Sequence, residues 1–163
     1  MTFEEFAATR MPAMLKFAAV LAGDRASAED LAQEVLVRAY SRWDKIGCLD
    51  RPEFYVRKMV LNEFLSWRRR SLRQTPANGA AARSASRAPD HADAYNERQA
   101  LLAEIGKLPR RQRAVLVLRY YEDRDDGEIA VLLGCTPGTV RSYASRALAA
   151  LRVEMDPRAK THA

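Results

Sequence analysis

Residues 127–152, GEIAVLLGCTPGTVRSYASRALAALR, decide the fold of the C-terminal part of the chain. A short apolar run ends at Gly134, a residue suited to a tight turn. Thr136 is a favourable helix N-cap, and Pro137 fits the first position of the helix that it would begin. The stretch therefore predicts two short helices joined by a tight turn.

The second of these helices has two chemically different sides. At helical spacing, its expected buried stripe consists of Val140, Ala144, Ala147, Leu148 and Leu151. Its opposite side carries Arg141, Ser142, Ser145 and Arg146. A helix, a glycine turn and a second helix with an exposed basic and hydroxyl-bearing side are typical of the helix-turn-helix motif, which reads duplex DNA.

Two small helical domains are expected. The C-terminal one, residues 96–155, adds predicted helices at 96–107 and 109–122, and Asp125 and Glu128 form a capping box for a third. The N-terminal one, residues 1–70, begins a helix with the capping box Thr2 and Glu5. A second helix from Ser27 has an apolar stripe, a loop follows at 44–50, and a third helix spans 52–70. The members of that stripe are Leu31, Ala32, Val35, Leu36, Ala39, Tyr40 and Trp43.

A change in composition separates the two domains. Residues 71–95 contain eight alanines, two prolines and one glycine, with large apolar residues only at the two ends. Such a segment cannot bury enough apolar surface to offset the entropy of ordering it. The predicted fold is therefore all-α, with two small helical domains joined by a flexible linker.

The whole-chain composition excludes several classes of function. A formal net charge of +6 suggests an anionic partner. No apolar run approaches the length of a membrane span, and the N-terminus is acidic where a signal peptide is basic, so we expect a cytoplasmic protein. Cys48 and Cys135 stand alone and His91 and His162 fall in the linker and tail, so we expect no metal, no cofactor and no enzyme.

Both halves of the chain resemble one family. DLAQEVLVRAYSRWDKI (30–46) and RPEFYVRKMVLNEFLSWRRR (51–70) resemble regions 2.2 to 2.4 of the extracytoplasmic-function (ECF) RNA polymerase sigma factors. LPRRQRAVLVLRYYEDRDDGEIAVLLGCTPGTVRSYASRALAALR (108–152) resembles their region 4. The details YVRKMVLN and SWRRR are most similar to the actinobacterial SigE-like subfamily.

The resemblance implies a promoter-specificity subunit with no catalysis of its own. Its partners would be core RNA polymerase and promoter DNA, with no membrane and no small-molecule substrate. Many relatives are held inactive by an anti-sigma factor, so a partner of that kind is a further hypothesis. The alternative from the residues alone is a helix-turn-helix transcriptional regulator with a helical sensor domain, which would bind duplex DNA without polymerase.

The resemblance also assigns residues to the polymerase contact. In the family, the second helix of region 2 grips the clamp helices of the largest polymerase subunit. The corresponding residues here are Asp30, Gln33, Glu34, Val37, Arg38 and Ser41. An ordinary solvated charged face is the alternative interpretation; such a face does not need Val37, but a single exposed valine is common on protein surfaces.

The third helix of the first domain is expected to meet the melted −10 element. Basic residues interleaved with aromatic residues suit single-stranded DNA, because cations neutralise phosphates and rings stack on bases. The expected contacts are Tyr55, Arg57, Lys58, Asn62, Trp67, Arg68, Arg69 and Arg70. Either ring could instead fill the core. Asn62 aligns with an asparagine that the family uses near the flipped base, and loop 44–50 is similar to the family's specificity loop.

The last helix is expected to read the −35 element in the major groove. Arginines there donate bidentately to guanine or contact phosphate, and hydroxyls bond base edges or backbone. Arginines at the start of the helix predicted at 109–122 are expected to face phosphate. The −35 contacts are Arg110, Arg111, Arg113, Thr139, Arg141, Ser142, Tyr143, Ser145 and Arg146. The resemblance further implies that region 4 holds the flap of the second-largest polymerase subunit.

Overall fold

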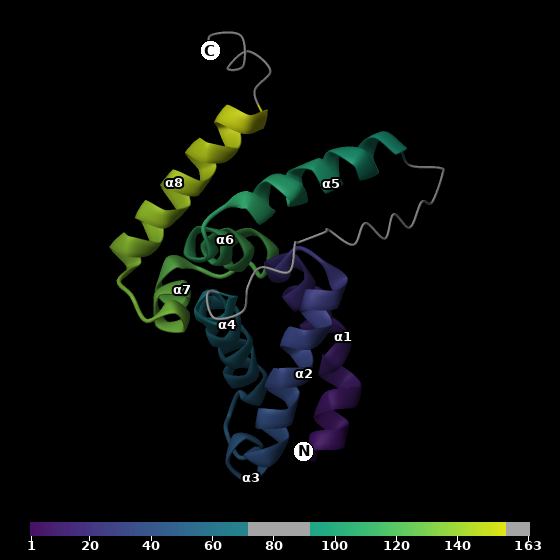
Figure 1. Ribbon diagram of the computed structural model, residues 1–163. Coiled ribbons are helices and arrows are strands. Elements are labelled where there is room, and N and C mark those ends of the chain that lie inside the picture. Colours follow the sequence, from purple (N-terminus) through teal and green to yellow (C-terminus); the bar gives the residue numbers. More distant parts are fainter. Residues whose placement is uncertain (72–91, 156–163) are drawn as a thin grey trace. The chain divides into compact units, whose positions relative to one another are not determined.

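The computed structural model describes residues 1–71 and 92–155, and all regular structure in these two ranges is helical (Figure 1). The first range contains α1 (Phe3–Ala22), α2 (Arg25–Ser41), α3 (Trp43–Ile46) and α4 (Pro52–Ser71). The second contains α5 (Ala92–Lys107), α6 (Arg110–Leu116), the π-helical η1 (Val117–Tyr121), α7 (Asp126–Leu133) and α8 (Pro137–Met155). The expected all-α class is therefore confirmed.

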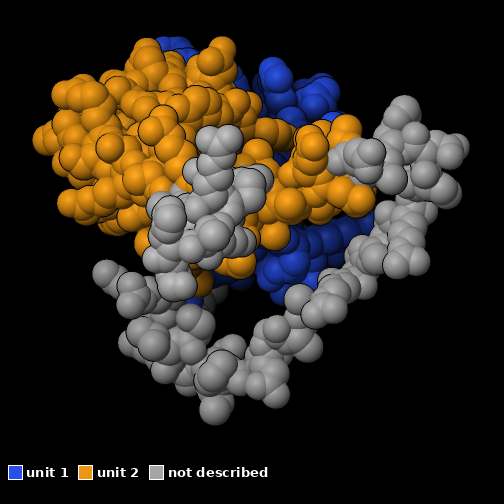
Figure 2. All heavy atoms as spheres, turned by 90° about the horizontal axis from the view of Figure 1, so that it is seen from above, with its two compact units in different colours: residues 1–80 blue, residues 81–163 orange. Residues whose placement is uncertain are grey.

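The chain divides into two compact units, residues 1–80 and residues 81–163, which Figure 2 colours separately. Most of the predicted linker, residues 72–91, lies outside the described residues, as does the C-terminal segment from residue 156. Helix α5 begins at Ala92, earlier than the predicted start at residue 96, so the last residues assigned to the linker are helical. The domain boundaries taken from the sequence stay a prediction.

Capping residues set the helix boundaries in unit 1. The Thr2 hydroxyl accepts a hydrogen bond from the Glu5 amide at 3.2 Å, and the Thr2 amide donates to the Glu5 carboxylate at 2.9 Å. Gly23 ends α1 with φ 86°, a left-handed conformation that favours glycine. Asp24 then accepts from the Ser27 amide at 2.7 Å and starts α2 just before the predicted position. These local signals were readable from the sequence.

The core of unit 1 lies where α1, α2 and α4 pack against one another. Its largest fully buried side chains are Phe6, Phe17 and Leu21 from α1, Leu31 and Val35 from α2, and Val56, Val60, Leu61 and Phe64 from α4. Each helix contributes one apolar stripe, as expected for a small helical bundle. Exposed residues of α2 and α4 are thereby held on a rigid frame.

The end of the stripe predicted on the second helix is wrong. Helix α2 ends at Ser41, and Arg42 takes a non-helical conformation with φ −122° and ψ 17°. Tyr40, still within α2, is exposed because it lies at the edge of the buried arc, next to the exposed Gln33, and its ring lies 5.1 Å from that of Phe3. Trp43 starts the separate helix α3 and packs 4.8 Å from the Phe6 ring. The segment predicted as a loop at 44–50 is thus helical over its first residues.

In unit 2, caps again define the helix-turn-helix. Asp125 and Glu128 form the predicted capping box at the start of α7, with the Glu128 amide donating to Asp125 at 2.8 Å. Gly134 ends α7 with φ 66°, and the Thr136 hydroxyl accepts from the Thr139 amide at 3.2 Å as α8 begins. Val140, Ala144 and Ala147 are buried against α6 and α7. Leu148 and Leu151, the other two residues of the predicted stripe, are partly buried against Leu108 and Leu116.

The helix predicted at 109–122 is interrupted. After α6, the backbone widens into η1, and the Glu122 amide donates to the Val117 carbonyl, five residues back, at 3.0 Å. Val117 and Leu118 stay buried, whereas Tyr120 is exposed. No signal in the sequence marked this change of helix type.

Two glycines of unit 2 should respond oppositely to the same substitution. Gly134→Ala forces a Cβ into a left-handed conformation, so we expect it to lower the free energy of unfolding of unit 2 by about 1 kcal/mol. Gly106→Ala in α5 meets no atom within 4 Å and should raise it by up to about 1 kcal/mol, because alanine favours the helix. Hydrogen exchange of the α7 and α8 amides measures both effects. A gain from Gly134→Ala would contradict the assigned turn.

Candidate nucleic-acid interface

The side of α8 opposite its buried stripe is accessible. Arg141, Ser142, Ser145 and Arg146 are exposed, as the sequence predicted, and Thr139 and Tyr143 are half-buried. The Thr139 hydroxyl lies 3.0 Å from that of Thr136, so it also belongs to the cap of α8. The helix therefore presents two arginines and two serines together, which suits hydrogen bonding to base edges and phosphates.

An acidic residue lies beside this basic side. Asp126, the first residue of α7, accepts a hydrogen bond from Arg119 of η1 through Oδ1. Its other oxygen, Oδ2, lies 4.0 Å from Nη1 of Arg141. The hydrogen bond to Asp126 raises the pKa of Arg119. The sequence prediction did not include Asp126, because nothing in the local pattern brings it to α8.

The arginines at the start of α6 do not act alike. Arg111 is exposed and Arg110 is half-buried. Arg113 instead donates through Nη2 to the carbonyls of Gly106 and Leu108, the latter at 3.2 Å. Burial, and to a lesser extent the charge of Arg110, lower its pKa. The prediction that Arg113 faces phosphate is therefore corrected, because its guanidinium caps the C-terminal end of α5.

In α4, the structure brings part of the predicted −10 set together. Tyr55 and Asn62 are exposed and Lys58 is half-buried, and their spacing of three and four residues places them on one side of the helix. Arg57 turns elsewhere, with its guanidinium carbon 5.6 Å from the centre of the buried Phe17 ring. The Trp67 ring lies 6.5 Å from that of Phe64. Arg68, Arg69 and Arg70 continue α4, but their side chains lie outside the described part.

The loop before α4 is short and accessible. After α3, Cys48 and Leu49 are exposed, and the Cys48 thiol donates to the Asp44 carbonyl at 3.2 Å. The Trp43 indole donates to the Met1 carbonyl at 3.1 Å, which ties the start of the chain to the base of this loop. The start of the loop is thus held by the core, and the following residues Cys48 and Leu49 are accessible.

The predicted polymerase-contact residues of α2 form one exposed side, with a single exception. Asp30, Gln33, Glu34, Val37 and Ser41 are all exposed. They cover about 100° of arc at 100° per residue. Val37, at 70% exposure, lies at the middle of this side. We call these five residues the α2 face.

Arg38 is the exception, because it bridges α2 to α4. It donates through Nη2 to Glu34 at 2.8 Å and through Nη1 to Glu63 at 2.7 Å. Only 3% of the Glu63 side chain is exposed. Burial lowers the pKa of Arg38, but its bonds to Glu34 and Glu63 outweigh this and raise it overall. Glu63 was not predicted, because it follows the exposed Asn62 and nothing in the local sequence distinguishes the two; once buried, its carboxylate requires a partner.

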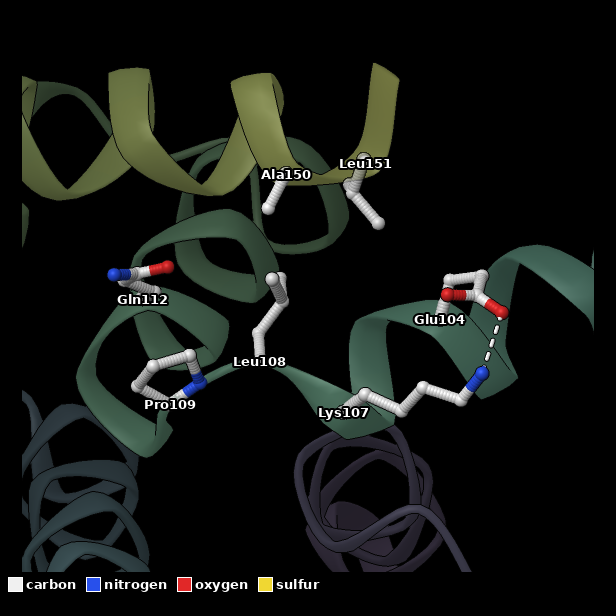
Figure 3. A pocket seen from close by; sticks show the side chains of 7 residues that line it. All are labelled: Glu104, Lys107, Leu108, Pro109, Gln112, Ala150 and Leu151. Carbon is white, nitrogen blue, oxygen red and sulfur yellow. Dashed lines mark hydrogen bonds and ion pairs between the residues drawn. The ribbon is translucent and has the colours of Figure 1, made fainter. Parts of the chain in front are cut away.

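A pocket of about 290 Å³ lies apart from the exposed side of α8, between α5, α6 and the end of α8. Figure 3 shows the Leu108 side chain pointing toward Ala150 and Leu151, with the Glu104–Lys107 ion pair of 2.8 Å at one rim. No group of His, Cys, Asp or Glu side chains within residues 1–71 and 92–155 could hold a metal ion. The lining is that of an incompletely covered core.

Family models match both units. Residues 7–74 match sigma-70 region 2, and residues 98–151 match sigma-70 region 4. The match of the first unit decides between the two functions that the sequence left open. The alternative needed a sensor domain in this part of the chain, and this part instead matches a sigma-factor region. Among the described helices, none has both the length and the apolar character needed to cross a bilayer.

Similar proteins agree with these matches. The RNA polymerase sigma-E factor of Streptomyces avermitilis is 40% identical over 96% of this chain and 86% of its own length. The ECF RNA polymerase sigma factor SigL of Mycobacterium tuberculosis is 34% identical over 86% of this chain and 81% of its own length. The sigma factor RpoE of Bartonella quintana, solved with the anti-sigma factor NepR, has a TM-score of 0.71 at 25% identity, covering 94% of this chain and 98% of that one. The chain therefore belongs to the ECF family of RNA polymerase sigma factors.

Proposed function

We propose that the two units of this sigma factor divide promoter recognition between them. As a family member, the chain binds core RNA polymerase and directs promoter-specific initiation of transcription. Within that function, unit 1 docks on polymerase through the α2 face and captures the −10 element with Tyr55, Lys58 and Asn62 of α4. In unit 2, α8 reads the −35 duplex. The chain specifies the promoter in the cytoplasm, and catalysis belongs to the polymerase.

The observation that carries the docking assignment is the exposed Val37 within a polar stripe. A solvated helix face gains nothing from a valine at its centre, whereas an interface buries apolar side chains at its core and polar ones at its rim. The surrounding charges of Asp30 and Glu34 then fix the register of the contact. Since Arg38 binds Glu63, its part is to hold α2 against α4, and it is not proposed as a direct contact.

The exposed side of α8 supports the assignment of −35 reading. Arg141 and Arg146 supply bidentate donors, and Ser142 and Ser145 supply hydroxyls beside them. Arg111 at the start of α6 adds a candidate phosphate contact. Arg113 is left out, since it caps α5.

An anti-sigma factor is a further expected partner. Two of the similar solved structures are complexes: the sigma factor RpoE with the anti-sigma factor NepR, and CnrH with the cytosolic domain of CnrY. An inhibitor of this kind would act by covering the α2 face or the exposed side of α8. Release of the inhibitor would then make the chain available to polymerase.

A charge placed on the α2 face should block docking. Val37→Asp is expected to weaken the binding of the full chain to core polymerase by about tenfold or more, because an unpaired carboxylate would be buried at the interface. The stability of the free chain should change by less than about 0.5 kcal/mol, since Val37 is exposed. Competition with a labelled sigma factor for core polymerase measures the affinity.

The matched control is Ala13→Asp, which adds the same charge at an exposed position of α1 in the same unit. It should leave the affinity for core polymerase unchanged. Equal weakening by both substitutions would mean that charge alone acts, and no weakening by Val37→Asp would remove the α2 face from the interface.

A further inference from the structure

The carboxylate of Asp126 lies between two arginines that come from different elements. Oδ1 accepts from Arg119 of η1, and the two side chains are about three-quarters buried, with 25% and 27% exposure. Oδ2 lies 4.0 Å from Nη1 of Arg141, whose side chain is 64% exposed. Asp126 therefore forms a close, partly buried ion pair with Arg119 and a longer, exposed one with Arg141.

The two ion pairs differ in how easily they exchange. The contact with Arg119 is partly shielded from water and holds the carboxylate in place as α7 begins. The contact with Arg141 is long and exposed, so it is weak and can be given up when DNA arrives. The other guanidinium nitrogen of Arg141, Nη2, lies within 3.8 Å of the position that a Cβ on Gly138 would take. The guanidinium of Arg141 thus lies close to Gly138, in the first turn of α8.

A fixed negative charge at this place has different effects on the two kinds of DNA contact. Phosphate contacts supply affinity that does not depend on sequence, and a carboxylate beside the arginine repels phosphate oxygens. A base edge carries no such charge, so a bidentate contact of Arg141 with a base is penalised less. Repulsion of the wrong ligand is an established way to obtain specificity.

We propose that Asp126 is a positioning residue that determines specificity in promoter reading. Through Oδ2 it attracts Arg141 weakly, and its charge disfavours the use of this arginine on phosphate, so that Arg141 contributes more to base discrimination than to sequence-independent binding. Arg119 keeps the carboxylate in position for this task. The inference rests on the proposed reading of DNA by α8.

The test removes only the negative charge of Asp126. In Asp126→Asn the amide oxygen can still accept from Arg119, and the side chain keeps its size. Holoenzyme is formed from the full-length variant and core polymerase. Two duplexes compete for it: a promoter fragment that the unaltered holoenzyme recovers from a genomic library, and the same fragment with its upstream element scrambled.

We expect Asp126→Asn to strengthen binding to the scrambled duplex by about threefold to fivefold, with a smaller change on the promoter, so that discrimination falls. Asp126→Glu, which restores the charge, should restore discrimination. The matched control is Asp123→Asn, which removes the same charge at a left-handed position that asparagine tolerates. In the described part of unit 2, Asp123 forms no ion pair with α8.

Arg141→Ala separates the inference from the proposed function. If Asp126 acts through Arg141, Asp126→Asn has no further effect on discrimination in the Arg141→Ala background. An effect that persists there, or one that Asp123→Asn reproduces, overturns the positioning role. If Arg141→Ala by itself leaves discrimination unchanged, the assignment of base reading to Arg141 fails first, and the inference fails with it.

Discussion

Transcription from a promoter that depends on its upstream element is expected to fall by about two orders of magnitude when Arg141 and Arg146 are both replaced by alanine. Each arginine that donates bidentately to a base contributes about 1–3 kcal/mol of discrimination, and separated contacts add approximately. Both side chains are exposed on α8. The substitutions should therefore affect DNA binding without unfolding unit 2. Multi-round transcription by the reconstituted holoenzyme measures the loss.

The control for this prediction removes the same charge from the same unit. Arg98 in α5 and Arg152 near the end of α8 are also exposed, and neither belongs to the proposed reading surface. Their double replacement by alanine should reduce transcription only slightly. If both double variants lost the same activity, the effect would come from net charge, and base reading by α8 would be contradicted.

Arg38→Ala is expected to lower the free energy of unfolding of unit 1 by about 2 kcal/mol. The substitution takes an ion-pair partner from the nearly inaccessible carboxylate of Glu63, and breaking a fully buried pair costs about 3–5 kcal/mol. The expected loss is smaller because Arg38 is 42% exposed, so water screens its side of the pair. Both tryptophans, Trp43 and Trp67, belong to unit 1, so intrinsic fluorescence during urea unfolding reports on that unit.

A second arginine of α2 supplies the matched control. Arg25 pairs with Glu29 at 2.9 Å, but its side chain is 88% exposed, so Arg25→Ala should cost less than about 0.5 kcal/mol. Glu63→Gln should recover much of the stability lost in Arg38→Ala, because a neutral amide costs less to bury than a carboxylate. Equal losses for Arg25→Ala and Arg38→Ala would show that the bridge to Glu63 is not a stabilising element.

Local signals made most of the helical framework predictable. The capping boxes at Thr2 and Asp125 and the turn at Gly134 each depend on residues a few positions apart, and the structure confirms all three. The exposed side of α8 followed from the same periodicity. Helix starts, turns and exposed sides are set by short-range geometry, which a single sequence contains.

The errors arose where distant residues decide the outcome. Arg38 has the same appearance as its solvated neighbours in the sequence, and only the packing of α4 shows that it bonds Glu63. Arg113 lies among other arginines in the sequence, yet its guanidinium donates to the Gly106 carbonyl at the end of α5. Trp43 does not continue the predicted stripe, because its ring packs against Phe6 of α1 and its indole donates to the Met1 carbonyl. Such tertiary contacts override what periodicity indicates.

Reconstituted transcription tests the central claim most directly. The purified full-length chain is added to sigma-free core polymerase with a library of genomic promoter fragments, and transcript starts are sequenced. Discrete starts that share two spaced upstream motifs, lost with Val37→Asp and with the Arg141 and Arg146 double variant, are the predicted result. The absence of starts, together with tight duplex binding by the chain without polymerase, would contradict the claim that the two units read the two promoter elements when bound to polymerase.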